Sequence, residues 1–319
     1  MKPIFIVGVG RSGTTLLANL LGSHAELSPV YETPFLRNLL LLCAWVEWYQ
    51  KKWFGRKLSS LVSDTPLRRR FLAKCEKYQE KCAVFSEMVA AQKPREFLVA
   101  ERIKQPYELF HYGDSHILFD LNRFRELTDE FLESLRAISN DPEHVYRLAR
   151  TYVDELFRDH CEHEGKPGWV NKTPRLLLCL DGLFKLFPTA RCIHILRDGR
   201  DVVASNLSLS WGPENVRDAA RRWRDRLEGR NKVNRSRDSF LEVRYEDLIK
   251  TPRETLTQIF SFLELSADID AILEKFKIYD QRVGAWRVAL GVDSRKVFAD
   301  VAGDLLTELG YEKDRNWIT

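Results

Sequence analysis

The chain has 319 residues, 44% of them apolar and 30% charged, which is an ordinary composition for a globular protein. Its formal net charge of +4 permits an anionic ligand but gives no argument for binding to nucleic acid or to a membrane surface. Six cysteines without a C-x-x-C pair argue against a zinc site and favour a reducing compartment. Because no signal peptide precedes the first apolar run, we expect a cytoplasmic protein without a transmembrane segment.

The start of the chain predicts a strand, a glycine-rich turn and the beginning of a helix. The run from Ile4 to Val7 is apolar and β-prone, glycines follow at positions 8, 10 and 13, and leucines recur at helical spacing over 16–21. Such a junction binds anions, because the first N–H groups of the helix converge on the turn and the helix dipole adds positive charge. Glycine also lets the backbone approach a phosphate closely.

Two phosphate-binding motifs overlap in this turn. Gly8, Gly10 and Gly13 fit the dinucleotide pattern G-x-G-x-x-G, and the same stretch fits the P-loop pattern G-x-x-x-x-G-K-[ST] with Thr14 in place of lysine. Since that lysine normally reaches the β- and γ-phosphates, an ordinary ATPase or kinase is disfavoured. Arg11 supplies a compensating cation that can fork onto a phosphate-like group. By itself the turn leaves open a dinucleotide ligand or no ligand at all.

The middle of the chain reads as a helical insertion over about residues 37–165. A short second strand is expected at Leu27–Glu32, and a new helix begins near Pro34. The apolar run at 39–46 is too short to span a bilayer, and we interpret it as a buried helix rather than a membrane-surface helix. No glycine-rich linker separates the insertion from the rest, so we expect one domain over residues 1–319.

Strands and helices alternate after the insertion. We expect strands at 169–172, 190–196 and 240–245, and helices at 175–187, 198–210, 216–234, 252–263, 269–276 and 294–309. This alternation predicts an α/β fold with a central parallel sheet flanked by helices, similar to P-loop proteins. In such a sheet the carboxyl ends of the strands meet at one edge, where ligands bind.

A second anion-binding element is predicted at that same edge. Arg197 ends a predicted strand, and Ser205 lies two turns into the helix that follows. Together they could hold a second phosphate. A redox dinucleotide enzyme does not need this arrangement, whereas a cofactor with phosphates at both its 5′ and 3′ positions does.

At this point the sequence resembles the sulfotransferases that use 3′-phosphoadenosine 5′-phosphosulfate (PAPS). Arg-Ser-Gly-Thr-Thr at 11–15 is similar to their 5′-phosphosulfate loop, and Arg-x-x-Arg-x-x-x-x-Ser at 197–205 to their 3′-phosphate element. Asn-Lys-Thr-Pro at 171–174, Tyr-Glu-Asp-Leu at 245–248 and Val-Gly-Ala-Trp-Arg at 283–287 resemble the protein-tyrosine sulfotransferases and their bacterial relatives. The resemblance covers residues 1–36 and about 165–312, while the insertion matches no family element.

The resemblance implies a role for each matching position. The 5′-phosphate and the sulfuryl group would be cradled by Arg11, Ser12, Gly13, Thr14 and Thr15. The remaining donor contacts would come from Arg197 and Ser205 at the 3′-phosphate, Tyr245 near the nucleotide, and Arg287 from the C-terminal segment.

Glu32 and Lys172 complete the expected site. Glu32 resembles the catalytic base of the tyrosine-sulfating branch, and Lys172 its transition-state lysine. Glu32 could instead cap a helix or bind a ribose hydroxyl, and Lys172 could be a surface charge. Tyr245 could be a packed aromatic, and His194 reads as a core histidine.

The sequence also departs from the family pattern. No histidine aligns with the base of the cytosolic branch, Leu209 stands where the tyrosine-sulfating branch has a basic residue, and no serine is found around 279–281. If Glu32 is not the base, His111 and His116 in the insertion are the next candidates.

The implied reaction moves a sulfuryl group from PAPS to a hydroxyl of an unidentified acceptor, which could be a small molecule, a lipid, a glycan or a tyrosine. No metal is expected. The insertion, with Trp45, Trp48, Trp53 and Phe54, would shape the acceptor pocket. The alternatives are a kinase-like or reductase nucleotide enzyme and a non-catalytic nucleotide-binding scaffold.

Overall fold

A computed structural model describes most of the chain outside the middle of the insertion. The described residues are 1–52, 66, 68–70, 72–76, 121–136, 142–209, 212–231, 238–276, 278 and 280–319. They form two compact units. The first unit comprises Met1–Pro3, Ala25–Thr173 and Cys179–Ala190, and the second comprises Ile4–His24, Pro174–Leu178 and Arg191–Thr319.

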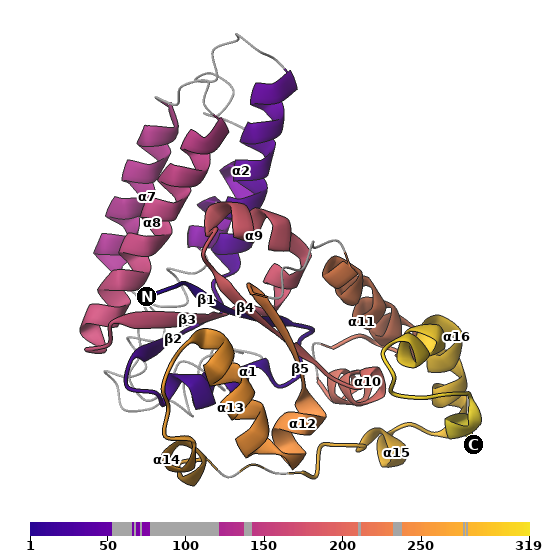
Figure 1. Cartoon of the computed structure of the whole chain (residues 1–319). Coiled ribbons are helices and arrows are strands. Elements are labelled where there is room, and N and C mark those ends of the chain that lie inside the picture. Colours follow the sequence, from indigo (N-terminus) through magenta and orange to yellow (C-terminus); the bar gives the residue numbers. More distant parts are fainter. Residues whose placement is uncertain are drawn as a thin grey trace, which may run out of the picture. The chain divides into compact units, whose positions relative to one another are not determined.

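The predicted α/β fold is confirmed, because five parallel strands form the sheet and helices flank it (Figure 1). In the first unit, β2 (Leu27–Tyr31) pairs in parallel with β3 (Gly168–Lys172). The register joins Tyr31 to Lys172, so the carboxyl ends of these two strands lie next to each other.

The second unit holds the other three strands. Here β4 (Arg191–Leu196) lies between β1 (Ile4–Gly8) and β5 (Phe240–Arg244), and both pairings are parallel. All five residues of β1 are buried, as expected for a parallel strand covered on both faces. Gly8 is paired with Ile195, which brings the segments that follow β1 and β4 to the same edge.

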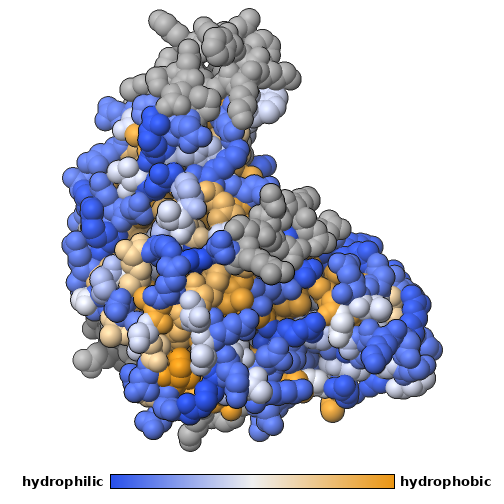
Figure 2. Space-filling model, viewed as in Figure 1, coloured by the Kyte–Doolittle hydropathy of each residue, from blue (hydrophilic) through white to orange (hydrophobic). Residues whose placement is uncertain are grey.

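The helices of the first unit make an aromatic-rich layer. Figure 1 shows α7 (Leu121–Arg136) and α8 (Pro142–His163) side by side, and α8 also packs against α2 (Pro34–Lys52) and α9 (Leu180–Leu186). Aromatic rings fill the interior of this layer, namely Phe35, Phe124, Phe131 and Tyr152. The outer side of α7 is largely hydrophilic on the face shown in Figure 2.

The apolar run in α2 is a buried helix, as predicted. Leu39, Leu40, Leu42 and Val46 are all at most 2% exposed, which the membrane-surface alternative does not allow. Within the described part of the chain, no helix combines the length and the apolar character needed to cross a bilayer.

In the second unit, helices follow each strand of the sheet. They are α1 (Thr14–Gly22), α10 (Gly199–Leu207), α11 (Val216–Asn231), α12 (Tyr245–Lys250), α13 (Pro252–Leu263), α14 (Ile269–Glu274), α15 (Trp286–Ala289) and α16 (Val292–Glu308), with a short 3₁₀ helix η2 (Asn316–Ile318) near the C-terminus. Trp223 of α11 is 1% exposed and meets Phe298 of α16, which fixes α11 against α16.

Several predicted elements differ in detail from the observed ones; α10, for example, ends at Leu207 where the prediction ran to residue 210. The helix expected at 175–187 is a 3₁₀ helix, η1 (Pro174–Cys179), followed by α9, because Cys179 leaves helical geometry at φ −134°. The strand expected at 240–245 ends one residue earlier, since Tyr245 begins α12. Trp53, Phe54, His111 and His116 lie outside the described residues, and the single-domain interpretation stays a prediction.

Candidate functional site

The turn between β1 and α1 has the geometry of an anion-binding loop. Gly13 has φ +90°, and a Cβ there would stand 2.3 Å from a ring carbon of Tyr245, so only glycine fits. At the start of α1, the Leu17 N–H donates to the Gly13 carbonyl at 3.0 Å. The N–H groups ahead of Leu17 therefore have no intrahelical acceptor and can bind an anion.

The two predicted phosphate motifs meet directly within the second unit. Arg197 donates from Nη1 to the carbonyl oxygen of Arg11 at 2.7 Å, and Arg11 donates from Nε to Ser205 Oγ at 3.0 Å. These two hydrogen bonds join residues that are separated by 186 and 194 positions in the sequence, at one edge of the sheet. The predicted location of both motifs at one edge is confirmed.

Arg197 is held in a nearly closed environment. It is 5% exposed, its Nη2 donates to the carbonyl of Arg282 at 2.5 Å, and its guanidinium lies 4.3 Å from the ring centre of Tyr245. Among the described residues, its buried Nε has no hydrogen-bond partner. A buried donor without an acceptor is costly, so this group is suited to an oxygen atom of a ligand.

Asp201 links Arg197 to the segment that carries Arg287. Its carboxylate lies 3.7 Å from Arg197 and accepts the N–H groups of Gly284 and Trp286 at 2.8 and 2.9 Å. Burial raises the pKa of Asp201, and the two backbone hydrogen bonds oppose that rise. Asp201 was missed in the sequence, although its i,i+4 spacing from Arg197 on a predicted helix was a usable signal.

Arg200, the other arginine of the second motif, is committed to packing. It is 2% exposed and stacks between the rings of Trp286 and Trp317 at 3.9 and 4.7 Å. Its guanidinium also pairs with Asp198 at 2.7 Å and Glu312 at 2.5 Å. Arg200 therefore anchors the C-terminal segment on α10, and Arg197 is the arginine of this motif that faces the loop.

In the first unit, Glu32 and Lys172 form an ion pair at the carboxyl ends of β2 and β3. Lys172 is 2% exposed and donates from Nζ to Glu32 Oε1 at 2.5 Å. The Glu32 N–H also donates to the Lys172 carbonyl at 2.8 Å. The alternative of Lys172 as a surface charge is wrong, because the ammonium group is buried and paired.

Buried hydroxyl and amide groups lock the two turns together behind this ion pair. The Thr33 N–H donates to Thr173 Oγ1 at 3.0 Å, and the two hydroxyl oxygens are also 3.0 Å apart. Asn171 donates from Nδ2 to Thr33 Oγ1 at 2.9 Å. Thr33 and Thr173 each precede a proline that begins a helix, so the network fixes the points where both strands end.

Backbone strain coincides with two of the predicted catalytic positions. In the described residues, the non-glycine residues with positive φ are Arg11 at 74°, Glu32 at 41° and Glu264 at 60°. Glu264 is the C-cap of α13, where a left-handed residue is common. The positive-φ conformations of Arg11 and Glu32 cost on the order of 1–3 kcal/mol each, and such strain clusters at functional sites.

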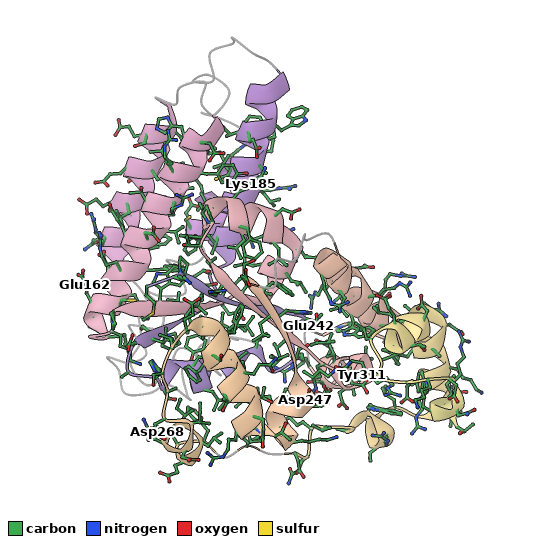
Figure 3. The ribbon with its side chains drawn as sticks, viewed as in Figure 1. Glu162, Lys185, Glu242, Asp247, Asp268 and Tyr311 are labelled. Carbon is green, nitrogen blue, oxygen red and sulfur yellow. The ribbon has the colours of Figure 1, made fainter. Side chains whose placement is uncertain are left out.

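The predicted core histidine is confirmed. His194 is fully buried in β4, and its Nδ1 lies 2.9 Å from Oε2 of Glu242, which is labelled on β5 in Figure 3. Arg230 donates to both carboxylate oxygens of Glu242 at 2.6 and 2.9 Å. Over the described ranges, no group of histidine, cysteine and carboxylate side chains has the arrangement of a metal site.

Comparison with known proteins gives the family. The sequence profile of the sulfotransferase family matches residues 3–269, and the chain belongs to this family. The nodulation protein NoeE of Sinorhizobium fredii is 28% identical over 209 residues, which are 52% of this chain and 50% of that protein. This chain thus matches about half the length of NoeE.

Two further relatives extend over nearly the whole chain. The omega-hydroxy-beta-dihydromenaquinone-9 sulfotransferase Stf3 of Mycobacterium tuberculosis is 23% identical over 98% of this chain and 76% of that protein. The solved sulfotransferase domain of the Synechococcus PCC 7002 olefin synthase has a TM-score of 0.50 and 20% identity, covering 95% of this chain and 94% of that one. That likeness supports the P-loop-type α/β fold.

Proposed function

We propose that the protein transfers a sulfuryl group from PAPS to a hydroxyl of an acceptor. The observation that carries this proposal is the direct contact between the two phosphate motifs, through Arg197, Arg11 and Ser205. A donor with anionic groups at its 5′ and 3′ positions needs both motifs in one place. Neither a kinase nor a reductase explains the second motif, and family membership also favours sulfuryl transfer.

The donor would be held by residues of the second unit. The N–H groups of the turn, together with Arg11, Ser12, Thr14 and Thr15, would bind the 5′-phosphosulfate end. Arg197 and Ser205 would bind the 3′-phosphate, and the orphaned Nε of Arg197 supports this role. The adenosine would be contacted near Tyr245, and Arg287 would approach from the segment held by Asp201.

Glu32 is the proposed proton acceptor. Glu32 would accept the proton of the acceptor hydroxyl as its oxygen bonds to sulfur and the bond to the bridging phosphate oxygen breaks. Arg11 and Lys172 would stabilise charge on the transferring group and the bridging oxygen, each worth about 3 kcal/mol in comparable sites. Positioning and electrostatics carry most of the rate in such in-line displacements.

For the acceptor we propose only a chemical class, a molecule that carries a hydroxyl group. The relative Stf3 is named as a sulfotransferase of a hydroxylated menaquinone derivative, and a hydroxyl-bearing acceptor is consistent with the Glu32 and Lys172 pair. Trp48 of α2 is 52% exposed, which supports a role for the insertion in acceptor binding. Free buried thiols at Cys43, Cys75, Cys161 and Cys192 fit a cytoplasmic, reducing location.

Transfer of labelled sulfur tests the proposal. The purified protein is incubated with sulfur-labelled PAPS and with separate lipid, glycan and tyrosine-peptide acceptor pools. We expect label in a sulfate ester formed from a hydroxyl-bearing acceptor, with Lys172→Ala abolishing the transfer and the exposed control Arg221→Ala leaving it unchanged. Wild-type protein that neither transfers label to any pool nor binds adenosine 3′,5′-bisphosphate would contradict it.

A further inference from the structure

Several arginines on α11 are neutralised by acidic partners. The pairs are Arg221 with Asp218 at 3.9 Å, Arg224 with Asp304 at 2.5 Å, and Arg230 with Glu242 at 2.6 Å. These ion pairs account for much of the positive charge of the helix. Three further arginines of the same helix, Arg217, Arg222 and Arg226, take no part in these three pairs.

Arg222 and Arg226 are four residues apart and share one face of α11. Arg226 is half-buried, and its Nη1 lies 3.6 Å from the position that a Cβ on Gly10 would occupy. Gly10 belongs to the turn after β1, so this arginine lies directly beside the predicted donor loop. A Cβ on Gly10 would make ordinary van der Waals contact with the guanidinium.

Arg175 is the third arginine of this cluster. Burial lowers the pKa of Arg226, and the charges of Arg175 and Arg222 lower it further. Within the described residues, no acidic side chain pairs with any of the three. Asp225 is adjacent in sequence to Arg226, but neighbouring positions on a helix do not face each other.

A half-buried guanidinium beside the loop, repelled by two further arginines, is unfavourable unless an anion compensates its charge. The donor leaves little need for them, because its 5′ and 3′ ends are already assigned to Arg11, Arg197, Arg287 and the N–H groups of the turn. Arginine forks also suit phosphate and sulfate groups better than point charges do. The surplus charge therefore indicates an anion other than the donor.

We infer that Arg175, Arg222 and Arg226 form a binding site for a phosphate or sulfate group carried by the acceptor. The inference rests on the proposed function and narrows its substrate class to an anionic alcohol. In this arrangement the cluster binds the acceptor's anionic group close to the donor loop. Arg226 is the central member, since its Nη1 lies beside Gly10 of the loop and the charges of both other arginines act on it.

Phenyl phosphate is a suitable probe, with phenol as its neutral counterpart. Calorimetry is performed on protein saturated with adenosine 3′,5′-bisphosphate, so that the donor groups are occupied. We expect phenyl phosphate, but not phenol, to bind the wild type. Arg226→Ala should raise the dissociation constant about tenfold or more, the usual effect of losing a hydrogen bond to a charged group. Arg226→Lys should retain part of the affinity, and the control Arg221→Ala should match wild type.

Arg222→Ala, on an exposed side chain, provides a second test if Arg226→Ala lowers the melting temperature. Equal affinity of the wild type and both alanine variants for phenyl phosphate would overturn the inference. The inference would also be overturned if Arg226→Ala weakened the binding of adenosine 3′,5′-bisphosphate as strongly as the binding of phenyl phosphate. The cluster would then belong to the donor site. A wild type that fails to bind adenosine 3′,5′-bisphosphate would overturn the inference and the proposed function together.

Discussion

The buried ammonium group of Lys172 lies 2.5 Å from Oε1 of Glu32, a residue 47% exposed and held in a left-handed backbone conformation. The pair lies where β2 and β3 end, and the Thr33, Thr173 and Asn171 network fixes both turns behind it. One carboxylate oxygen is thus held by the lysine while much of the Glu32 side chain remains open to solvent. This arrangement suits a positioned proton acceptor.

Replacement of Glu32 by glutamine tests the base. Glutamine keeps the size and can still accept a hydrogen bond from Lys172, but it cannot take a proton. We expect kcat to fall about 100-fold or more, the usual contribution of a general base, with donor affinity little changed. Single-turnover rates and a calorimetric titration on the same variant measure the two quantities.

The alternatives for Glu32 give the opposite pattern. If Glu32 were a helix cap, the Glu32→Gln variant would be less stable, and if it were a ribose ligand, the variant would bind nucleotide more weakly. In both cases the rate of the chemical step would be nearly unchanged at saturation. A normal single-turnover rate in Glu32→Gln would remove Glu32 as the base. The search would then turn to His111 and His116.

Arg197→Ala tests the assignment of the 3′-phosphate. The substitution should weaken the binding of adenosine 3′,5′-bisphosphate by about 1.5–3 kcal/mol, the range for a hydrogen bond to a charged group. Adenosine 5′-phosphosulfate lacks the 3′-phosphate, so its binding should be weakened far less. Because Arg197 also holds the carbonyl of Arg11, Ser205→Ala serves as a companion variant that leaves this contact in place. Equal losses for both ligands in Arg197→Ala would refute the assignment.

Metal independence is expected from the loop itself. Thr14 replaces the P-loop lysine, and the donor has no β- and γ-phosphates for Mg²⁺ to bridge. Turnover should therefore persist after exhaustive treatment with EDTA. A requirement for Mg²⁺ that survives controls for contaminating ions would speak for the kinase-like alternative.

Glu242 predicts a pH dependence of stability. Burial raises its pKa, but hydrogen bonds from His194 and Arg230 outweigh that effect and lower the pKa to about 2, from 4.5. A depressed folded-state pKa stabilises the protein above the unfolded value, and the contribution is lost as pH falls from about 4.5 toward 2. Its full size is on the order of 3 kcal/mol.

Urea unfolding of wild type and Glu242→Gln between pH 7 and pH 3 measures this contribution. The difference in unfolding free energy should be largest at neutral pH and shrink on acidification. Asp270→Asn removes an exposed partner of Arg253 and should change little at any pH. A difference that stays constant down to pH 3 would contradict the ion-pair account.

The sequence predicted the elements whose signals are local. The strand, turn and helix around Gly13 followed from an apolar run, three glycines and spaced leucines. The strand over 191–196 was equally clear. The helix that begins at Tyr245 was missed because the alternating run before it extends the strand pattern through that residue.

The site was predictable only through the resemblance. Nothing local in the sequence joins Glu32 to Lys172, which are 140 positions apart, or gives Glu32 its left-handed backbone. Asp201 carries a local signal in its spacing from Arg197, but its bonds to Gly284 and Trp286, like the approach of Arg226 to Gly10, join distant segments and could not be predicted from local sequence. Arg226 stood out only as one charge among many on a basic helix.

The most direct test of donor use is a side-by-side calorimetric titration of the wild-type protein with adenosine 3′,5′-bisphosphate, ATP and NADPH, in the absence of added metal. The contact between the 5′ loop and Arg197 predicts that adenosine 3′,5′-bisphosphate binds with one site per chain and at least about tenfold more tightly than either other nucleotide, a difference of about 1.4 kcal/mol. Tighter binding of ATP or NADPH, or no binding of adenosine 3′,5′-bisphosphate, would contradict the account.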